Sequence, residues 1–102
     1  MLLGAALGFT DYSMSPADLA PALEQRGFES LWAPDHSHIP VERRSPWPGG
    51  SELPRQYWNL MDPFICLSVA AAVTTTLKLG TGVCLVNQRD PIQTAKQVAS
   101  LD

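Results

Sequence analysis

A helix-start signal occurs three times in this chain. Each time, a residue whose side-chain oxygen can cap a helix stands directly before a proline: Ser15–Pro16, Asp62–Pro63 and Asp90–Pro91. A capping oxygen accepts hydrogen bonds from the free N–H groups of the first helical turn, and proline suits the first helical position. The sequence therefore predicts three helices. Asp18 stands where a capping-box acid would, and Gly27 is placed to end the first helix in the left-handed conformation.

Apolar segments alternate with these helices and are predicted to be strands. They run from Leu2 to Phe9, from Ser30 to Pro34 and from Leu77 to Val83. The first is expected to be buried on both faces. Alternating strands and helices favour a parallel sheet with right-handed crossovers. The predicted fold class is therefore α/β. Both a doubly wound sheet and a TIM barrel fit, and the absence of GxGxxG after the first strand weakens the dinucleotide-binding reading.

Composition and charge narrow the class of protein. The chain has 102 residues, of which 45% are apolar. Its net charge of −3 and the lack of a basic patch argue against nucleic acid as a partner. Its longest apolar run, Phe64 to Val73, is far shorter than the roughly 20 residues that span a bilayer. The N-terminal segment lacks the positively charged region of a signal peptide, so no signal peptide is predicted. Cys66 and Cys84 are predicted to be buried free thiols, which fits a reducing cytoplasm.

Two segments carry the residues with chemical potential. In "SLWAPDHSHIP", Pro34 ends the second strand and Asp35, His36 and His38 follow at once. A histidine there is commonly a surface residue, and the spacing of these side chains matches no strong zinc pattern, so no metal is predicted. The long segment "SHIPVERRSPWPGGSELPRQYWN" is rich in proline but contains three aromatic residues. It is predicted to be a structured lid or substrate loop rather than a disordered one.

Four segments resemble the luciferase-like monooxygenase superfamily, and in particular its oxidoreductases that depend on the deazaflavin coenzyme F-420. They are "RGFESLWAPDHSHIP", "RRSPWPGGSELPRQYW", "MDPF" and "LKLGTGVCLVNQRDPIQTAKQVASLD". The resemblance implies a TIM (β/α)8 barrel, of which three βα units are visible with a long loop after the second strand. A full barrel takes about 250 residues. Residues 1–102 are therefore expected to be the incomplete N-terminal part of a single barrel domain.

The resemblance also implies roles for individual residues. His36 would take part in proton transfer near the reactive carbon, and Asp35 would be its partner or a contact to the cofactor. A non-prolyl cis peptide at Gly82–Val83 would lie behind the deazaflavin ring, which makes both residues cofactor contacts. Trp47 is a weaker candidate for a substrate-side lid, and His38 is expected to be part of the loop structure.

F-420 carries a phosphate and an acidic tail, so cations are expected near it. The candidates in this chain are Arg43, Arg44, Arg55 and Arg89, although charged loop residues are usually only solvated. In the family that the chain resembles, most cations for the tail come from later units of the barrel.

The resulting functional hypothesis is hydride transfer between C5 of F-420 and a small organic substrate. The enzyme would be cytoplasmic, with a homodimer as its candidate assembly and no nucleic-acid or membrane partner. An FMN-dependent monooxygenase of the same superfamily is the alternative. A third hypothesis is a truncated chain that is inactive or serves only in interactions. Three strands leave open sheet edges, so the chain alone is expected to be inactive, marginally stable and prone to associate.

Overall fold

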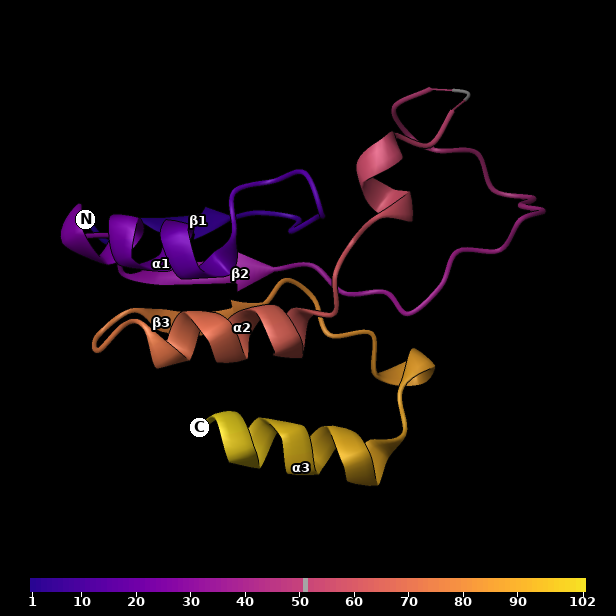
Figure 1. Ribbon diagram of the computed structural model, residues 1–102. Helices are drawn as coiled ribbons and strands as arrows, with labels where there is room; N and C mark the ends of the chain where they lie inside the picture. Colours follow the sequence, from indigo (N-terminus) through magenta and orange to yellow (C-terminus); the bar gives the residue numbers. More distant parts are fainter. Residues whose placement is uncertain (51) are drawn as a thin grey trace.

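The computed structural model describes residues 1–50 and 52–102, and shows a parallel sheet with helices packed on it (Figure 1). The strands lie in the order β1-β2-β3, and both neighbouring pairs are parallel. Their bounds are Gly4–Ala6 for β1, Ser30–Ala33 for β2 and Lys78–Thr81 for β3. The helices are α1 (Pro16–Gln25), α2 (Pro63–Ala72) and α3 (Pro91–Leu101). The predicted α/β class is therefore confirmed, with three successive βα units and shorter strands than expected.

All three predicted helix starts are confirmed by hydrogen bonds to the capping side chains. Ser15 accepts the N–H of Asp18 at 3.2 Å, Asp62 accepts that of Phe64 at 2.8 Å, and Asp90 accepts that of Gln93 at 2.8 Å. Gly27 follows α1 with φ of +77°, a left-handed conformation that favours glycine. The helix starts could be predicted from the sequence because each cap joins residues that lie within one helical turn of each other.

The hydrophobic core lies between the sheet and the helices. Leu31 and Ala33 of β2 are almost fully buried against Ala20 and Leu23 of α1 and Leu67 of α2, within one cluster. Ala5 and Leu79 from the neighbouring strands pack against the same cluster. Alternate residues of a strand face opposite sides of the sheet, so one face of all three strands supplies this core.

The opposite face of the sheet is open among the described residues. Trp32 points to it and is 44% exposed, with its indole N–H donating to Ser30 at 3.0 Å. A Cβ added at Gly80 would lie 2.5 Å from this ring, so only glycine leaves room for the indole. The prediction that the first strand is buried on both faces is wrong here, because Gly4 and Ala6 are exposed where no described segment covers them.

The two cysteines differ in their environments. Cys66 on α2 is a buried free thiol, and burial, together with the nearby Asp62 carboxylate, raises its pKa. Cys84 is also free but only partly buried, so the prediction of a buried thiol is wrong for this residue. It lies beyond the end of β3.

The described part of α3 is loosely covered. Its apolar side chains Ile92, Ala95, Val98 and Ala99 are exposed, and only Thr94 and Leu101 of the helix are partly buried. Within the described ranges, no helix combines the length and the apolarity needed to cross a membrane.

A single glutamate organises the turn between α2 and β3. One carboxylate oxygen of Glu24, near the end of α1, accepts the N–H groups of Thr75, Thr76 and Leu77 at 2.9, 2.6 and 2.9 Å. It also accepts the Thr76 hydroxyl at 2.9 Å. The N–H of Thr76 contributes most to lowering the pKa of Glu24 from 4.5 to about 2, followed by the N–H of Thr75.

We expect Glu24 to make stability depend on pH in acid. The pKa of Glu24 is lower in the folded than in the unfolded chain. Its contribution to the free energy of unfolding is therefore complete above about pH 4.5 and is lost as the pH falls toward about 2. Glu24→Gln should lower the melting temperature at neutral pH, and its difference from the wild type should shrink across that interval. The measurement is thermal unfolding by circular dichroism at a series of pH values. Glu42→Gln, in the exposed loop, is the matched control, and a pH-independent difference for Glu24→Gln would contradict the expectation.

Candidate functional site

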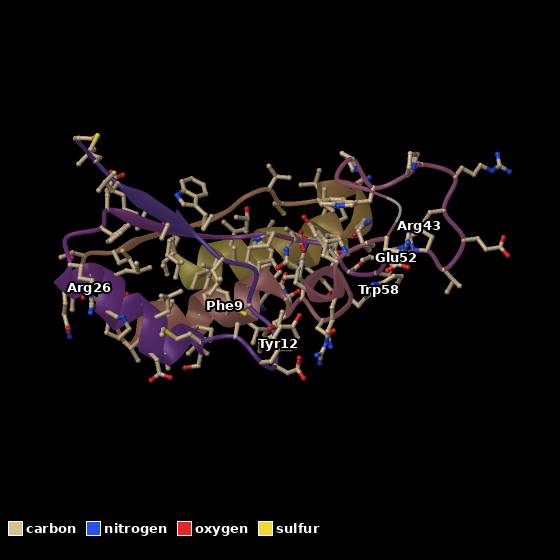
Figure 2. The ribbon with its side chains drawn as sticks, turned by 90° about the horizontal axis from the view of Figure 1, so that it is seen from above. Phe9, Tyr12, Arg26, Arg43, Glu52 and Trp58 are labelled. Atoms are coloured by element: carbon tan, nitrogen blue, oxygen red, sulfur yellow. The ribbon has the colours of Figure 1, made fainter. Side chains whose placement is uncertain are left out.

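The candidate site lies beyond the carboxyl ends of the strands, where the long loop between β2 and α2 extends from the sheet (Figure 1). This loop contains the 3-10 helix η1 (Arg55–Trp58), and a second one, η2 (Val86–Gln88), follows β3. Figure 2 shows that Arg43, Glu52 and Trp58 of the loop lie at the opposite end of the molecule from Arg26, which follows α1. Active sites of parallel α/β folds occupy this end of the sheet.

Asp35 is held in a buried ion pair. Its carboxylate accepts Arg89 Nε at 2.7 Å on Oδ2 and Arg89 Nη2 at 2.5 Å on Oδ1. Oδ2 also accepts the N–H of Leu85 at 3.0 Å. The side chain of Asp35 is 1% exposed and that of Arg89 is 11% exposed. Such a bidentate pair fixes geometry as well as supplying energy, so the end of β2 is joined to the segment that follows β3.

Arg89 also reaches the start of α2. Its Nη2 donates to Asp62 Oδ2 at 2.9 Å, and its guanidinium lies 4.8 Å from the centre of the Phe64 ring. The hydrogen bonds from Arg89 hold the pKa of Asp35 below its ordinary value, although burial opposes this shift. In turn Asp35, and then Asp62, raise the pKa of Arg89. Arg89 therefore links β2, the segment after β3 and the cap of α2 as a permanent cation.

His36 turns to the other side and contacts η1. Its Nε2 lies 2.7 Å from the backbone oxygen of Tyr57. Because a carbonyl oxygen only accepts hydrogen bonds, Nε2 must carry the proton, which leaves Nδ1 as the free ring nitrogen of the neutral imidazole. The His36 and Tyr57 rings are nearly parallel with centroids 6.3 Å apart, and Trp47 packs on Tyr57 at 4.9 Å. Trp47 thus belongs to the aromatic wall beside His36.

Gln88 holds the residue after His36. Its Oε1, at the end of η2, accepts the backbone N–H of Ser37 at 2.9 Å and the Ser37 hydroxyl at 3.3 Å. The same hydroxyl lies 2.7 Å from Nδ1 of His38. His38 is therefore engaged locally, as expected of a loop residue.

The end of β3 provides the remaining predicted site residues. The Gly82–Val83 peptide bond is cis, which confirms that part of the prediction. The N–H of Gly82 donates to the carbonyl of Ala33 at 2.8 Å, so this bond lies beside the end of β2. Val83 is 65% exposed.

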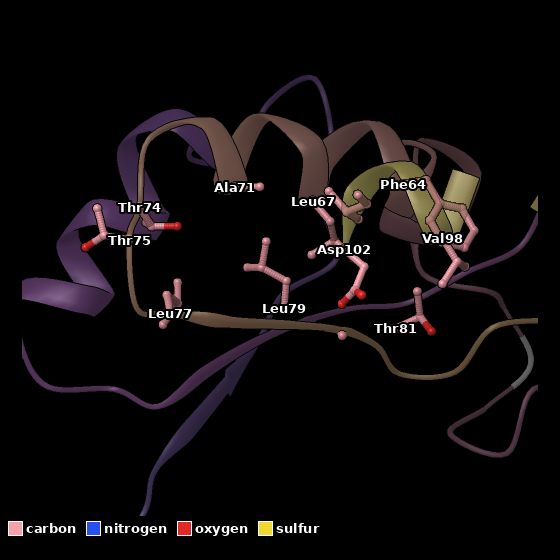
Figure 3. A pocket seen from close by; sticks show the side chains of 12 residues that line it. Phe64, Leu67, Ala71, Thr74, Thr75, Leu77, Leu79, Thr81, Val98 and Asp102 are labelled. Carbon is pink, nitrogen blue, oxygen red and sulfur yellow. The ribbon is translucent and has the colours of Figure 1, made fainter. Parts of the chain in front are cut away.

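Two cavities differ in their chemistry. A small one of about 90 Å³ is lined by His36, His38, Tyr57 and Trp58, among others. A larger one of about 450 Å³ lies between α2, β3 and α3, and Figure 3 shows mainly apolar side chains around it, such as Leu67, Leu79 and Val98. The smaller cavity is the one beside the histidines. Among the described residues, no group of three His, Cys, Asp or Glu side chains is placed to hold a metal ion.

Three of the four candidate arginines have partners that the sequence alone did not reveal. Arg43 lies 5.0 Å from the Trp58 ring and Arg55 lies 4.5 Å from the Tyr12 ring, while Arg44 is exposed. Arg89 is committed to Asp35 and Asp62, so the prediction that it is a cation for the phosphate or tail of a cofactor is not supported by its contacts. Sequence reasoning also missed Gln88 and the Tyr57 carbonyl. A buried acid needs a cation, but spacing alone does not say which of several arginines supplies it.

Comparisons with known proteins show which family the chain is similar to. Residues 15–102 match the sequence model of a family described as luciferase-like monooxygenase. An uncharacterized protein of Mycobacterium tuberculosis (strain ATCC 25618 / H37Rv) is 39% identical over 105 residues, which is 100% of this chain and 37% of the relative. An uncharacterized protein of Mycobacterium bovis matches to the same extent. The chain thus spans little more than a third of the length of these relatives.

Proposed function

Because this chain belongs to the luciferase-like monooxygenase family, we propose that it is the N-terminal part of a single TIM-barrel domain in an F-420-dependent oxidoreductase. The reaction is hydride transfer between C5 of the deazaflavin and a small organic substrate. The proposed enzyme acts in the cytoplasm, and a homodimer is its candidate assembly. The family, the three parallel βα units and the placement of His36 at the carboxyl end of β2 support the proposal.

One observation carries the role of His36. Its Nε2 is anchored on the Tyr57 carbonyl, so the ring has a defined orientation and tautomer, and Nδ1 is the atom available for proton exchange. An imidazole has an ordinary pKa of about 6.5, which suits a group that gives or takes a proton near neutrality. We assign His36 the proton transfer that accompanies oxidation or reduction of the substrate.

The fit of a flat cofactor is supported by the end of β3. Gly82 has no side chain there, and the nearest atom to an added Cβ would be Trp32 Cβ at 3.7 Å, which is ordinary contact. Val83 is exposed beside it. F-420, when bound, supplies a carbon that accepts or donates a hydride. Gly82 and Val83 would support its ring, and Trp47 would belong to the lid on the substrate side.

In this proposal Asp35 holds the end of β2 in place and is not a hydrogen-bond partner of the His36 ring. In the described structure its carboxylate bonds to Arg89 and Leu85, whereas the His36 ring bonds to Tyr57. With its side chain almost completely buried, Asp35 supports the cofactor site by holding the end of β2. Of the two roles first considered, a partner of the His36 ring is therefore disfavoured by these contacts.

The test is a titration of the complete protein that carries this sequence with F-420 and, separately, with FMN. We expect F-420 to bind at least about tenfold more tightly, a difference of about 1.4 kcal/mol. Quenching of the cofactor fluorescence measures both affinities. His36→Gln serves as the control, because it removes an acid/base group and should leave binding nearly unchanged.

Each of the other two outcomes of the titration would favour a different function. Tighter binding of FMN would reject F-420 and favour the FMN-dependent monooxygenase of the same family. Binding of neither cofactor would reject both and favour a chain that serves only in interactions.

A further inference from the structure

We infer that Gln88 and Arg89 are positioning residues for His36, an inference that rests on the proposed role of His36 in proton transfer. These consecutive residues bond to Ser37 and Asp35, the two neighbours of His36 in the chain. The histidine is thereby fixed from both sides by a segment about fifty residues away in sequence.

The contacts divide between two sides of the chain after β2. The side chain of Asp35 and the backbone N–H and hydroxyl of Ser37 meet the segment 85–89. The His36 ring contacts the Tyr57 carbonyl in η1 instead. The contacts of residues 35 and 37 therefore lie on one segment, and the contact of residue 36 lies on another.

The chemistry of these contacts suits a positioning role. Arg89 uses two donors on one carboxylate, which fixes direction better than a single hydrogen bond does. Gln88 uses one oxygen for two donors of Ser37. Neither residue makes a hydrogen bond to the His36 ring in the described structure, so both act through the backbone of residues 35–37. Proton transfer depends on placement of the acid or base to within a fraction of an ångström.

The experiment records the ring nitrogens of His36 by NMR in the complete protein labelled with 15N-histidine, and assigns them with His36→Gln. At about pH 9, well above the ordinary histidine pKa, the wild type should show one tautomer with a protected Nε2–H. In Gln88→Ala and Arg89→Met, this proton should exchange about tenfold faster, and both tautomers should appear. Arg89→Lys should restore the wild-type signals in part. Asn87→Ala, in the same 3-10 turn, is the matched control and should leave them unchanged.

Wild-type signals in both Gln88→Ala and Arg89→Met would overturn the inference, as would a wild-type ring without a single tautomer. If Arg89→Met fails to fold, Gln88→Ala decides, because it removes exposed hydrogen bonds and leaves the buried ion pair intact. Steady-state kinetics of Gln88→Ala should show a lower kcat with KM nearly unchanged. A protein without F-420 activity would reject the proposed function, whereas the NMR comparison would still decide whether Gln88 and Arg89 position His36.

Discussion

Replacement of His36 by glutamine in the complete protein should lower kcat by about 10²–10⁴-fold, the usual contribution of a positioned acid or base. The amide nitrogen of glutamine can take the place of Nε2 and donate to the Tyr57 carbonyl, which His36 contacts at 2.7 Å. Glutamine has no group that exchanges a proton at the position of Nδ1. The variant should therefore keep the local structure and lose the proton transfer.

The loss is measured as hydride transfer, by the change in absorbance of F-420 under saturating substrate. His38→Gln is the matched control, because His38 lies two residues away and contacts the Ser37 hydroxyl. Its kcat should stay within a few-fold of the wild type. Equal losses in the two variants, or a His36→Gln variant with nearly full activity, would show that His36 is not the acid/base.

The replacement Arg89→Met should destabilise the protein by about 3–5 kcal/mol, the cost of breaking a buried pair by removing one partner. Asp35 would remain as a carboxylate whose side chain is 1% exposed, and the Leu85 N–H, which still donates to it, does not neutralise its charge. The cap of α2 would also lose its contact from Arg89 to Asp62. This is a large part of the 5–15 kcal/mol by which folded proteins are typically stable.

Urea denaturation followed by circular dichroism measures this effect. Arg55→Met is the matched control, since it removes an exposed cation over the Tyr12 ring, a contact worth only about 0.5–1 kcal/mol. Adding Asp35→Asn to Arg89→Met should restore part of the stability, because it removes the unpaired charge. A loss for Arg89→Met no larger than that for Arg55→Met would contradict the assigned role of the ion pair.

Most of the architecture could be predicted because its signals are local. Ser15, Asp62 and Asp90 each cap a helix by bonding to N–H groups two or three residues away, and all three helices begin where expected. The strands were recognised as apolar runs, but they are shorter than predicted. Strand bounds depend on hydrogen bonds to a neighbour, and Ala33 is the last residue of β2 that pairs with β3.

The candidate site was only partly predictable. The sequence placed Asp35 and His36 at the end of a strand, and the parallel fold brings this end beside Gly82 and the segment that follows β3. It did not show that the His36 ring bonds to a backbone oxygen of Tyr57, because a carbonyl has no signature in the amino-acid sequence. The partial exposure of Cys84 was likewise hidden, since burial depends on which segments cover a residue.

Sequence alone determined the order of strands and helices, the helix caps and the residues with catalytic potential, because these follow from contacts within a few positions of the chain. Only the tertiary structure decided which of four candidate arginines pairs with Asp35. Arg89 forms ion pairs within the fold, with Asp35 and Asp62, and is therefore not assigned to a cofactor phosphate. Arg89 and Asp35 lie 54 residues apart. Their pairing results from the parallel order of β2 and β3, which brings the ends of both strands together and places a cation where a buried carboxylate requires one.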